Sequence, residues 1–336
     1  MSPDRFDEIV SAYSELRIAV VGDFCLDRYL EIDPARAETS IETQLPVHNV
    51  THVRYQPGGA GTIVNNLSAL GVKEIFPIGF CGNDAEGFEL LSSLERVHRV
   101  HLDHFLQTSE RRTFTYCKPL LMREDGAPEE LSRLDFKNWT PTPDSVAGQL
   151  AHSIRKLGTS VNAMIVLDQV DEPDTGVINR IVLEAIGEVL ASNPNLTALG
   201  DSRRGFENWP RVSLKMNAAE FERFMEFGVS DVGQGQVAGD IVGRHGQMFV
   251  TMADDGIVGF DADGIRHHDP ALPVRGEIDI VGAGDAVTAN LTCALASGAK
   301  VDESILLANR AASIVIHQLG TTGTASVEDM RNTASK

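Results

Sequence analysis

Short apolar runs alternate with longer amphipathic stretches along most of the chain. The first run, Leu16-Arg-Ile-Ala-Val-Val21, suits a buried strand and ends in Gly22 and Asp23. We predict strands at 16–21, 74–78, 163–167, 196–200, 247–251 and 277–281, and helices at 60–70, 86–94, 145–157, 175–191, 218–227, 286–297 and 302–317. This alternation is typical of an α/β fold, with a mostly parallel sheet covered by helices on both faces. In such folds, ligands bind beyond the carboxyl ends of the strands.

Two stretches depart from this rhythm. Residues 39–54 and 111–118 alternate between apolar and polar positions with no helix between neighbouring runs, as strands do. We interpret them as a small β lid that projects from the main domain. The alternative is that they are edge strands of the main sheet.

Composition excludes several classes of protein. The chain has 336 residues with a formal charge of −19, which argues against a nucleic-acid binder because such proteins carry basic surfaces. No apolar run approaches 18 residues and the first 15 residues do not resemble a signal peptide, so we expect a cytoplasmic protein with no membrane contact. The four cysteines form no CxxC pair, which favours reduced, buried thiols. We predict a single domain over residues 1–336.

The segment Asp279-Ile-Val-Gly-Ala-Gly-Asp285 is the most informative one. Gly282, Ala283 and Gly284 leave backbone N–H groups accessible where a helix begins, and the positive end of the helix dipole lies behind them. This arrangement predicts a site for a phosphate oxygen, and Asp285 places an acceptor beside it. An anion hole with an adjacent base is what phosphoryl transfer to a hydroxyl requires. The alternative is a tight turn in which Asp285 merely caps its helix.

Two further motifs, both in the first part of the chain, suggest contacts with a ligand. The glycine-rich run Pro57-Gly-Gly-Ala-Gly-Thr62 precedes a helix that contains Asn66, and a ligand can approach such a backbone closely. Asp23 and Asp27 follow the first strand, where carboxylates can accept hydrogen bonds from the hydroxyls of a sugar. Each could equally be a helix cap or a turn former.

Two motifs in the second half suggest phosphate and cation contacts. Asn217 and Glu220 are three residues apart at a helix start, so both side chains project from one face. Glu220 could reach a hydrated Mg²⁺, which takes few direct protein ligands, although a plain capping box fits the same spacing. Arg203 follows a predicted strand and could hold a phosphate.

Gly58-Gly59, Asn217-x-x-Glu220 and Gly282-Ala-Gly-Asp285, in this order, resemble the ribokinase-like (PfkB) carbohydrate kinases over residues 17–328. Val21-Gly-Asp-x-x-Leu-Asp-Arg-Tyr29, Arg133-Leu-Asp-Phe136 and Leu319-Gly-Thr321 are similar to the heptose-7-phosphate kinase branch of that family. The resemblance implies a three-layer α/β/α fold with a β lid, ATP and Mg²⁺ as cofactors with a monovalent cation as a further candidate, and a sugar or sugar phosphate as substrate. It also suggests a homodimer formed through the lid.

The resemblance implies a role for each matching residue. Asp285 would be the base, and the amides of Gly282, Ala283 and Gly284 would stabilise the transferring phosphoryl group. Glu220 would hold Mg²⁺ through water. The other residues of the nucleotide site would be Asn217, Arg203, Thr251, Gly256, Asn309 and Gly320. The residues of the sugar site would be Asp27, Gly58, Gly59, Asn66, Glu42 and Lys118.

Three positions depart from the family pattern. Val281 replaces a small polar residue, Thr62 replaces an asparagine, and Glu38 stands where the heptose-kinase branch has a basic residue. Glu38 counts against a phosphorylated heptose but leaves kinase chemistry intact. A nucleoside kinase of the same fold and a sugar- or nucleotide-sensing protein without catalysis remain alternatives.

Overall fold

The main element of the fold is an eight-stranded sheet with the order β17-β16-β15-β14-β13-β12-β1-β6. The computed structural model describes residues 1–123, 128–228 and 241–334. The six neighbouring strands β6, β1, β12, β13, β14 and β15 run parallel to one another. Strands β16 and β17 pair antiparallel at the β15 edge of the sheet. The mostly parallel sheet is therefore confirmed. Its strands are β1 (Arg17–Gly22), β6 (Glu74–Ile78), β12 (Ala163–Asp168), β13 (Thr197–Ser202), β14 (Ser213–Asn217), β15 (Met248–Thr251), β16 (Ile257–Phe260) and β17 (Arg266–Asp269).

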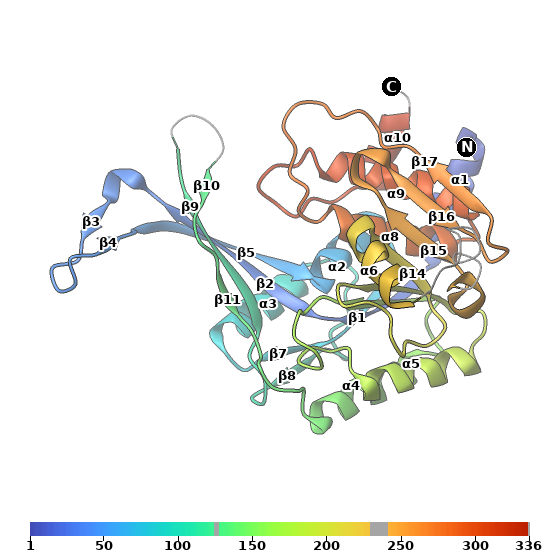
Figure 1. Ribbon diagram of the computed structural model, residues 1–336, viewed down its shortest axis with the longest axis horizontal. Coiled ribbons are helices and arrows are strands. Elements are labelled where there is room, and N and C mark those ends of the chain that lie inside the picture. Colours follow the sequence, from blue (N-terminus) through green and yellow to red (C-terminus); the bar gives the residue numbers. More distant parts are fainter. Residues whose placement is uncertain (124–127, 229–240, 335–336) are drawn as a thin grey trace.

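Helices cover both faces of this sheet (Figure 1). Successive side chains of a strand point to opposite faces, so Ile18 and Val20 join one apolar cluster while Ala19 and Val21 join another. The first cluster includes residues of α1 (Pro3–Ser11), α2 (Ala60–Ala69), α8 (Ala283–Ala296), α9 (Val301–Val315) and α10 (Val327–Ala334). The opposite face carries α4 (Asp144–Leu157), α5 (Arg180–Ser192) and α6 (Ala218–Gly228). These layers confirm the three-layer α/β/α architecture.

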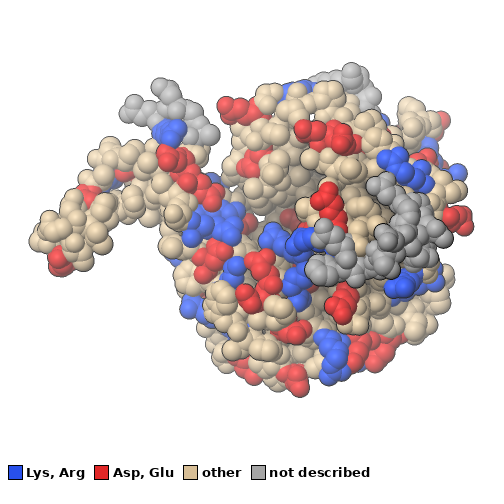
Figure 2. Space-filling view, in the orientation of Figure 1, with Lys and Arg blue, Asp and Glu red and all other residues tan. Residues whose placement is uncertain are grey.

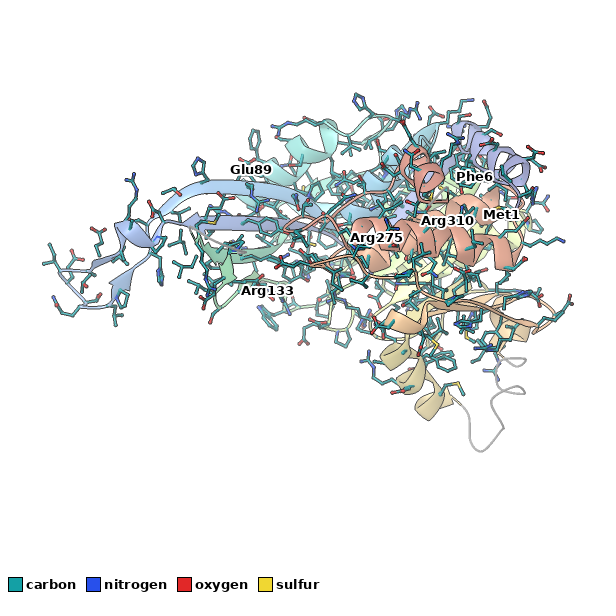
Figure 3. All side chains as sticks on the ribbon, turned by 90° about the horizontal axis from the view of Figure 1, so that it is seen from above. Met1, Phe6, Glu89, Arg133, Arg275 and Arg310 are labelled. Atoms are coloured by element: carbon teal, nitrogen blue, oxygen red, sulfur yellow. The ribbon has the colours of Figure 1, made fainter. Side chains whose placement is uncertain are left out.

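A second, five-stranded sheet, here called the lid sheet, extends from the main body (Figures 1 and 3). It consists of β2 (Phe24–Ile32), β5 (Val50–Gly59), β9 (Phe114–Leu121), β10 (Glu129–Glu130) and β11 (Leu134–Phe136), and β2 lies between β5 and β9. The hairpin of β3 (Glu38–Thr39) and β4 (Pro46–Val47) lies at its far end (Figure 1). Smaller elements are β7 (Phe80–Gly82), β8 (Leu106–Thr108) and α3 (Ala85–Glu95). Because β5 and β9 pair with β2, the alternative of edge strands in the main sheet is wrong.

The structure corrects two predicted elements. The expected strand at 277–281 is a loop, because Asp279 binds the chain around it: its backbone N–H donates to the Ile316 carbonyl (2.8 Å), and its carboxylate accepts from the N–H groups of Val281 and Gly320 (3.0 and 3.1 Å). The helix expected at 175–191 begins only at Arg180. Asn179 caps it by accepting from the Val182 N–H at 3.2 Å. Strands β2, β14, β16 and β17 and helices α1 and α10 were not among the predicted elements.

Candidate active site

Several polar residues, among them the predicted site residues Asn217 and Thr251, lie where the parallel strands end. Asp23 follows β1, Asp168 and Ser202 end β12 and β13, and Asn217 and Thr251 end β14 and β15. Asn217 and Thr251 are direct neighbours in the parallel register. Figure 2 shows Lys and Arg side chains interspersed with Asp and Glu side chains on the face between the lid sheet and the main body. Charged side chains of both signs therefore gather at this edge of the main sheet.

The N-terminus of α8 has two of the three unpaired backbone N–H groups that the predicted anion hole requires. Gly282 is its N-cap, in a left-handed conformation (φ 84°) that favours glycine. The N–H of Ala283 donates to the Ile280 carbonyl at 3.2 Å and is not free. Among the described residues, no acceptor is bound to the N–H groups of Gly282 and Gly284. Of the predicted amides, these two are therefore available to an anion.

Asp285 lies in the first turn of α8 and is partly exposed. Burial of its carboxyl group raises the pKa to about 7, and the nearby Asp201 carboxylate adds to this rise. The cations of Lys215 and Arg203 oppose the shift. A carboxyl group with a pKa near neutrality is suited to act as a general base, because it is partly ionised and still accepts a proton readily.

A buried ion pair beneath α8 was not predicted from the sequence. Lys215 on β14 donates to the Asp201 carboxylate on β13 at 2.8 Å, and the Thr288 hydroxyl of α8 donates to the same oxygen at 2.8 Å. Burial alone would lower the pKa of Lys215, but Asp201, Asp285 and Glu220 together raise it above its ordinary value. The signal in the sequence was a lysine inside the otherwise apolar run Leu214-Lys-Met216.

The lid sheet contributes a second ion pair. Asp27 on β2 lies 3.2 Å from the ammonium of Lys118 on β9, and Lys118 also contacts the Tyr29 hydroxyl at 3.4 Å. Burial raises the pKa of Asp27, and the Lys118 charge opposes that rise. A Cβ at Gly58 would lie 2.7 Å from Asp27, so glycine is needed there for steric reasons. The charge of Asp27 also contributes to the raised pKa of Asp285, so the two carboxyl groups interact electrostatically.

Four other predicted residues make contacts within the protein or lie at the far end of the lid sheet. Asn66 is fully buried and donates to the carbonyls of Thr62 and Gly323 (3.0 and 3.3 Å), so it joins α2 to the segment before α10. Glu42 is exposed in the turn between β3 and β4, at the far end of the lid sheet, and not at the site of this chain.

Asn309 donates from its amide to the carbonyl of Pro270 (2.7 Å) and to Asp269. Gly256 packs against the same loop, since a Cβ there would lie 2.1 Å from the Asp269 carbonyl. These two residues therefore hold the loop that follows β17.

Asp23, which the sequence left open between a sugar ligand and a turn former, is structural. Its buried carboxylate accepts hydrogen bonds from the backbone N–H groups of Gln169 (2.8 Å), Val170 (3.2 Å) and Val177 (2.6 Å). Burial raises its pKa to about 6, with a further rise from Asp168, and the three N–H donors oppose the shift. Its backbone carbonyl is also why Gly59 is a glycine, because a Cβ there would lie 2.5 Å from it.

Asn217 and Glu220 form a reciprocal capping box at the start of α6. The N–H of Asn217 donates to the Glu220 carboxylate, and the N–H of Glu220 donates to the Asn217 side chain, both at 2.8 Å. One Glu220 carboxylate oxygen stays without a hydrogen bond from the described residues. Within the described part of the chain, no group of three or more His, Cys, Asp or Glu could hold a metal. A cation here would therefore bind mainly through water and substrate phosphates, as Mg²⁺ commonly does.

Thr251 and Gly320 are two further residues predicted for the nucleotide site. Thr251 donates weakly to the Met216 carbonyl at 3.5 Å. Gly320, in a left-handed conformation (φ 69°), donates to Asp279, and its carbonyl accepts from Arg54 of the lid sheet at 3.4 Å. Gly320 thus connects the loop before the anion hole to the lid sheet.

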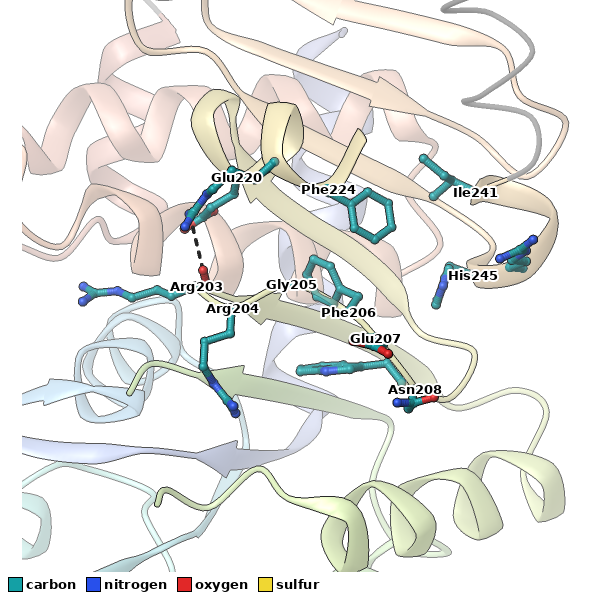
Figure 4. A pocket seen from close by; sticks show the side chains of 13 residues that line it. Arg203, Arg204, Gly205, Phe206, Glu207, Asn208, Glu220, Phe224, Ile241 and His245 are labelled. Carbon is teal, nitrogen blue, oxygen red and sulfur yellow. Dashed lines mark hydrogen bonds between the residues drawn. The ribbon is translucent and has the colours of Figure 1, made fainter. Parts of the chain in front are cut away.

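Arg203 lines a pocket of about 900 Å³ (Figure 4). Its N–H donates to the Asp168 carbonyl at 3.1 Å, and its guanidinium lowers the pKa of Asp285. Arg204 pairs instead with the buried Asp168 carboxylate at 2.9 Å. The pocket is lined by aromatic, cationic and acidic side chains, among them Phe206, Trp209, Glu220, Arg223 and Phe224.

No helix in the described ranges is both long and apolar enough to cross a lipid bilayer.

Comparison with known proteins identifies proteins that are similar to this chain. Residues 212–328, which include Lys215, Asn217, Glu220 and the anion hole, match the pfkB family of carbohydrate kinases. The bifunctional protein HldE of Trichlorobacter lovleyi is 30% identical over 333 residues, covering 98% of this chain and 65% of that protein. HldE of Rhodospirillum rubrum is 29% identical over 96% of this chain and 63% of its own length. The chain thus spans less than two thirds of the curated relatives that it matches.

Solved structures share the fold. Phosphofructokinase-2 of Escherichia coli in complex with substrates and products superposes with a TM-score of 0.69 at 17% identity, covering 94% of this chain and 97% of that one. Arabidopsis thaliana ribokinase with ribose and ATP gives 0.66 at 19% identity, covering 94% and 98%. These solved structures thus show a ribokinase-like fold. Residues 212–328 are similar to the pfkB family of carbohydrate kinases, and nearly the whole chain is similar to part of the HldE proteins, in agreement with the resemblance found in the sequence.

Proposed function

We propose that this protein transfers the γ-phosphate of ATP to a hydroxyl group of a sugar or sugar phosphate, within a single kinase domain. The observation that carries the proposal is the first turn of α8, where free backbone amides lie next to a carboxyl group with a pKa near 7. An anion hole and a base at one helix end are the two groups that this reaction needs. A protein that only senses a ligand has no need of the base.

Each side of the site has a defined task under this proposal. Asp285 accepts the proton of the attacking hydroxyl, while the amides of Gly282 and Gly284 bind the phosphoryl oxygens. Asp27 and Lys118 of the lid sheet orient the sugar, because they form a buried ion pair and the Asp27 charge acts on Asp285. Closing the lid sheet would exclude water as a competing acceptor.

Mg²⁺ fits the residues present. The free Glu220 oxygen at the start of α6, beside the anion hole, suits a water-mediated contact, and the bound cation would neutralise charge on the ATP phosphates. A monovalent cation is a further candidate, since a potassium complex of Escherichia coli phosphofructokinase-2 shares the fold.

The acceptor is a sugar, with or without a phosphate group. The curated relatives are named as bifunctional HldE proteins, which favours the heptose-kinase branch. Lys118, Arg133 and Arg203 supply positive charge around the site, and Figure 3 shows Arg133 on the lid sheet. Glu38, which stands where the heptose-kinase branch has a basic residue, is exposed and accepts a hydrogen bond from the Asn49 amide at 3.1 Å. As an acidic residue, it offers no positive charge to a sugar phosphate.

Two further properties are proposed with the activity. A homodimer through the lid sheet fits the exposed apolar side chains of its outer end, Ile41, Leu45, Val50 and Val53. A cytoplasmic location fits the four cysteines, all of them free and buried.

The proposal is tested by measuring ADP release from Mg²⁺ and ATP with a panel of pentoses, hexoses, heptoses, their phosphates and adenosine. We expect turnover with one sugar or sugar phosphate. Turnover with adenosine alone would establish a nucleoside kinase instead. If nothing turns over while sugars still raise the melting temperature, the protein is a sensor and the proposal is wrong.

A further inference from the structure

A buried cation lies directly beneath the anion hole. Lys215 is 6% exposed, and its ammonium would lie 3.2 Å from a Cβ added at Gly284. Gly284 is in the first turn of α8, next to Asp285. The last glycine of the Gly-Ala-Gly motif therefore leaves room for the Lys215 ammonium, in addition to freeing the backbone for a ligand.

The hydrogen bonds of Lys215 leave part of its donor capacity unused. A lysine ammonium carries three donors, and Asp201 is the one acceptor hydrogen-bonded to it among the described residues. The Thr288 hydroxyl holds that same Asp201 oxygen, which fixes the pair against α8. The free donors thus lie at the base of a site built from backbone amides.

A purely structural ion pair explains these contacts poorly. Taking two charges out of water costs several kcal/mol, and apolar residues of similar size often replace a buried pair without loss of stability. Here the lysine stands between two apolar residues, Leu214 and Met216, both of which are fully buried. A cation at this point is useful where a negative charge enters the site.

We propose that Lys215 is a catalytic residue that donates a hydrogen bond to the transferring phosphoryl group, with Asp201 and Thr288 as its positioning residues. The inference rests on the proposed function. As the sugar oxygen forms its bond to the γ-phosphorus, the bond from that phosphorus to the β–γ bridging oxygen breaks, and its electron pair leaves with ADP. The hydroxyl proton goes to Asp285. Lys215 keeps its protons and stabilises charge on the phosphoryl oxygens throughout.

The test separates this role from a structural one. Lys215→Met removes the cation but leaves Asp201 without its buried counter-ion, which by itself lowers stability. The double variant Lys215→Met with Asp201→Leu removes both charges. Arg204→Met is the matched control, because it breaks a different ion pair, with buried Asp168, that includes no residue of α8. All assays are run at pH 8.5, where the carboxyl group of Asp285 is ionised.

Binding is measured first, by calorimetry with ADP and with the non-hydrolysable ATP analogue AMP-PNP, without any sugar. We expect the preference for AMP-PNP over ADP to fall at least roughly tenfold in both Lys215 variants and to persist in Arg204→Met. With the accepted sugar, kcat should fall at least roughly a hundredfold while the KM for sugar changes little. The melting temperature should fall in the single variant and recover in the double one.

The inference is overturned if the double variant recovers the AMP-PNP preference and turnover along with its stability, because Lys215 would then be a structural counter-ion only. It is also overturned if Arg204→Met loses the preference to the same extent. If the wild-type protein phosphorylates no sugar, the proposed function fails. The binding measurements still decide whether Lys215 contacts the terminal phosphate.

Discussion

Replacing Asp285 by asparagine should make the protein less active and more stable at the same time. The amide keeps the shape of the protonated acid but cannot accept the hydroxyl proton. Turnover should therefore fall at least roughly a hundredfold, while ADP binding is retained. Stability should rise, because the native structure disfavours the charge that the wild-type residue carries at high pH.

The magnitude follows from the pKa. Burial and Asp201 raise the pKa of Asp285 from 3.8 to about 7, which corresponds to roughly 4 kcal/mol at most. The partial exposure of Asp285 reduces this to about 1–2 kcal/mol. A raised pKa means that the folded state binds the proton more tightly, so the wild-type protein loses stability as pH rises from about 4 to about 7. Because asparagine does not ionise, the Asp285→Asn variant does not lose this part of its stability as pH rises.

The measurements are kcat from pH 5.5 to 9 and denaturant unfolding at pH 5 and pH 8.5. Wild-type kcat should rise through an ionisation near pH 7, because burial, and then the charges of Asp201, Lys215, Arg203 and Asp27, set the pKa of Asp285. Asp302→Asn, at an exposed position in the first turn of α9, is the control and should change neither quantity. Near-wild-type turnover of Asp285→Asn, or a loss of stability at pH 8.5, would refute the reasoning.

Four other substitutions test separate parts of the site. Lys118→Met should raise the KM for sugar at least roughly tenfold with little change in the KM for ATP, because it removes the counter-ion of Asp27; steady-state kinetics checks this. Glu220→Gln keeps the capping box but loses the charge, so the Mg²⁺ concentration for half-maximal activity should rise roughly tenfold at unchanged melting temperature. Asp23→Ala should lower the free energy of unfolding by about 2 kcal/mol or more, because three backbone donors lose their acceptor; an unchanged denaturation midpoint would contradict this. Ile41→Asp, at a position 91% exposed on the lid hairpin, should convert a lid-mediated dimer to monomers in light scattering, and a dimer that persists would place the interface elsewhere.

The periodicity of the chain predicted most of the main domain. Buried parallel strands need continuous apolar runs, and covering helices need a period of 3.6 residues, so β1, β6, β12 and β15 and their helices were visible in the sequence. The prediction of a strand at 277–281 was wrong, because the apolar side chains of this run stay exposed before the start of α8. The side chain of Ile280, for example, is 73% exposed. Strand pairing decided β2 and β14, whose polar residues (Asp27, Lys215) hide a strand pattern but are satisfied by partners on other strands.

Residue types and spacing alone predicted the unpaired amides of Gly282 and Gly284, since a glycine turn with a following carboxylate acts locally at one helix end. Only the tertiary structure decided which side chains face that end. It turned Asp23 toward backbone amides of a distant loop, assigned Asn309 and Asn66 to holding segments together, and brought Lys215 and Asp201 under α8 from adjacent strands. Such contacts join positions up to hundreds of residues apart, and a carboxylate, amide or ammonium has the same appearance in the sequence whether its partner is the protein or a ligand.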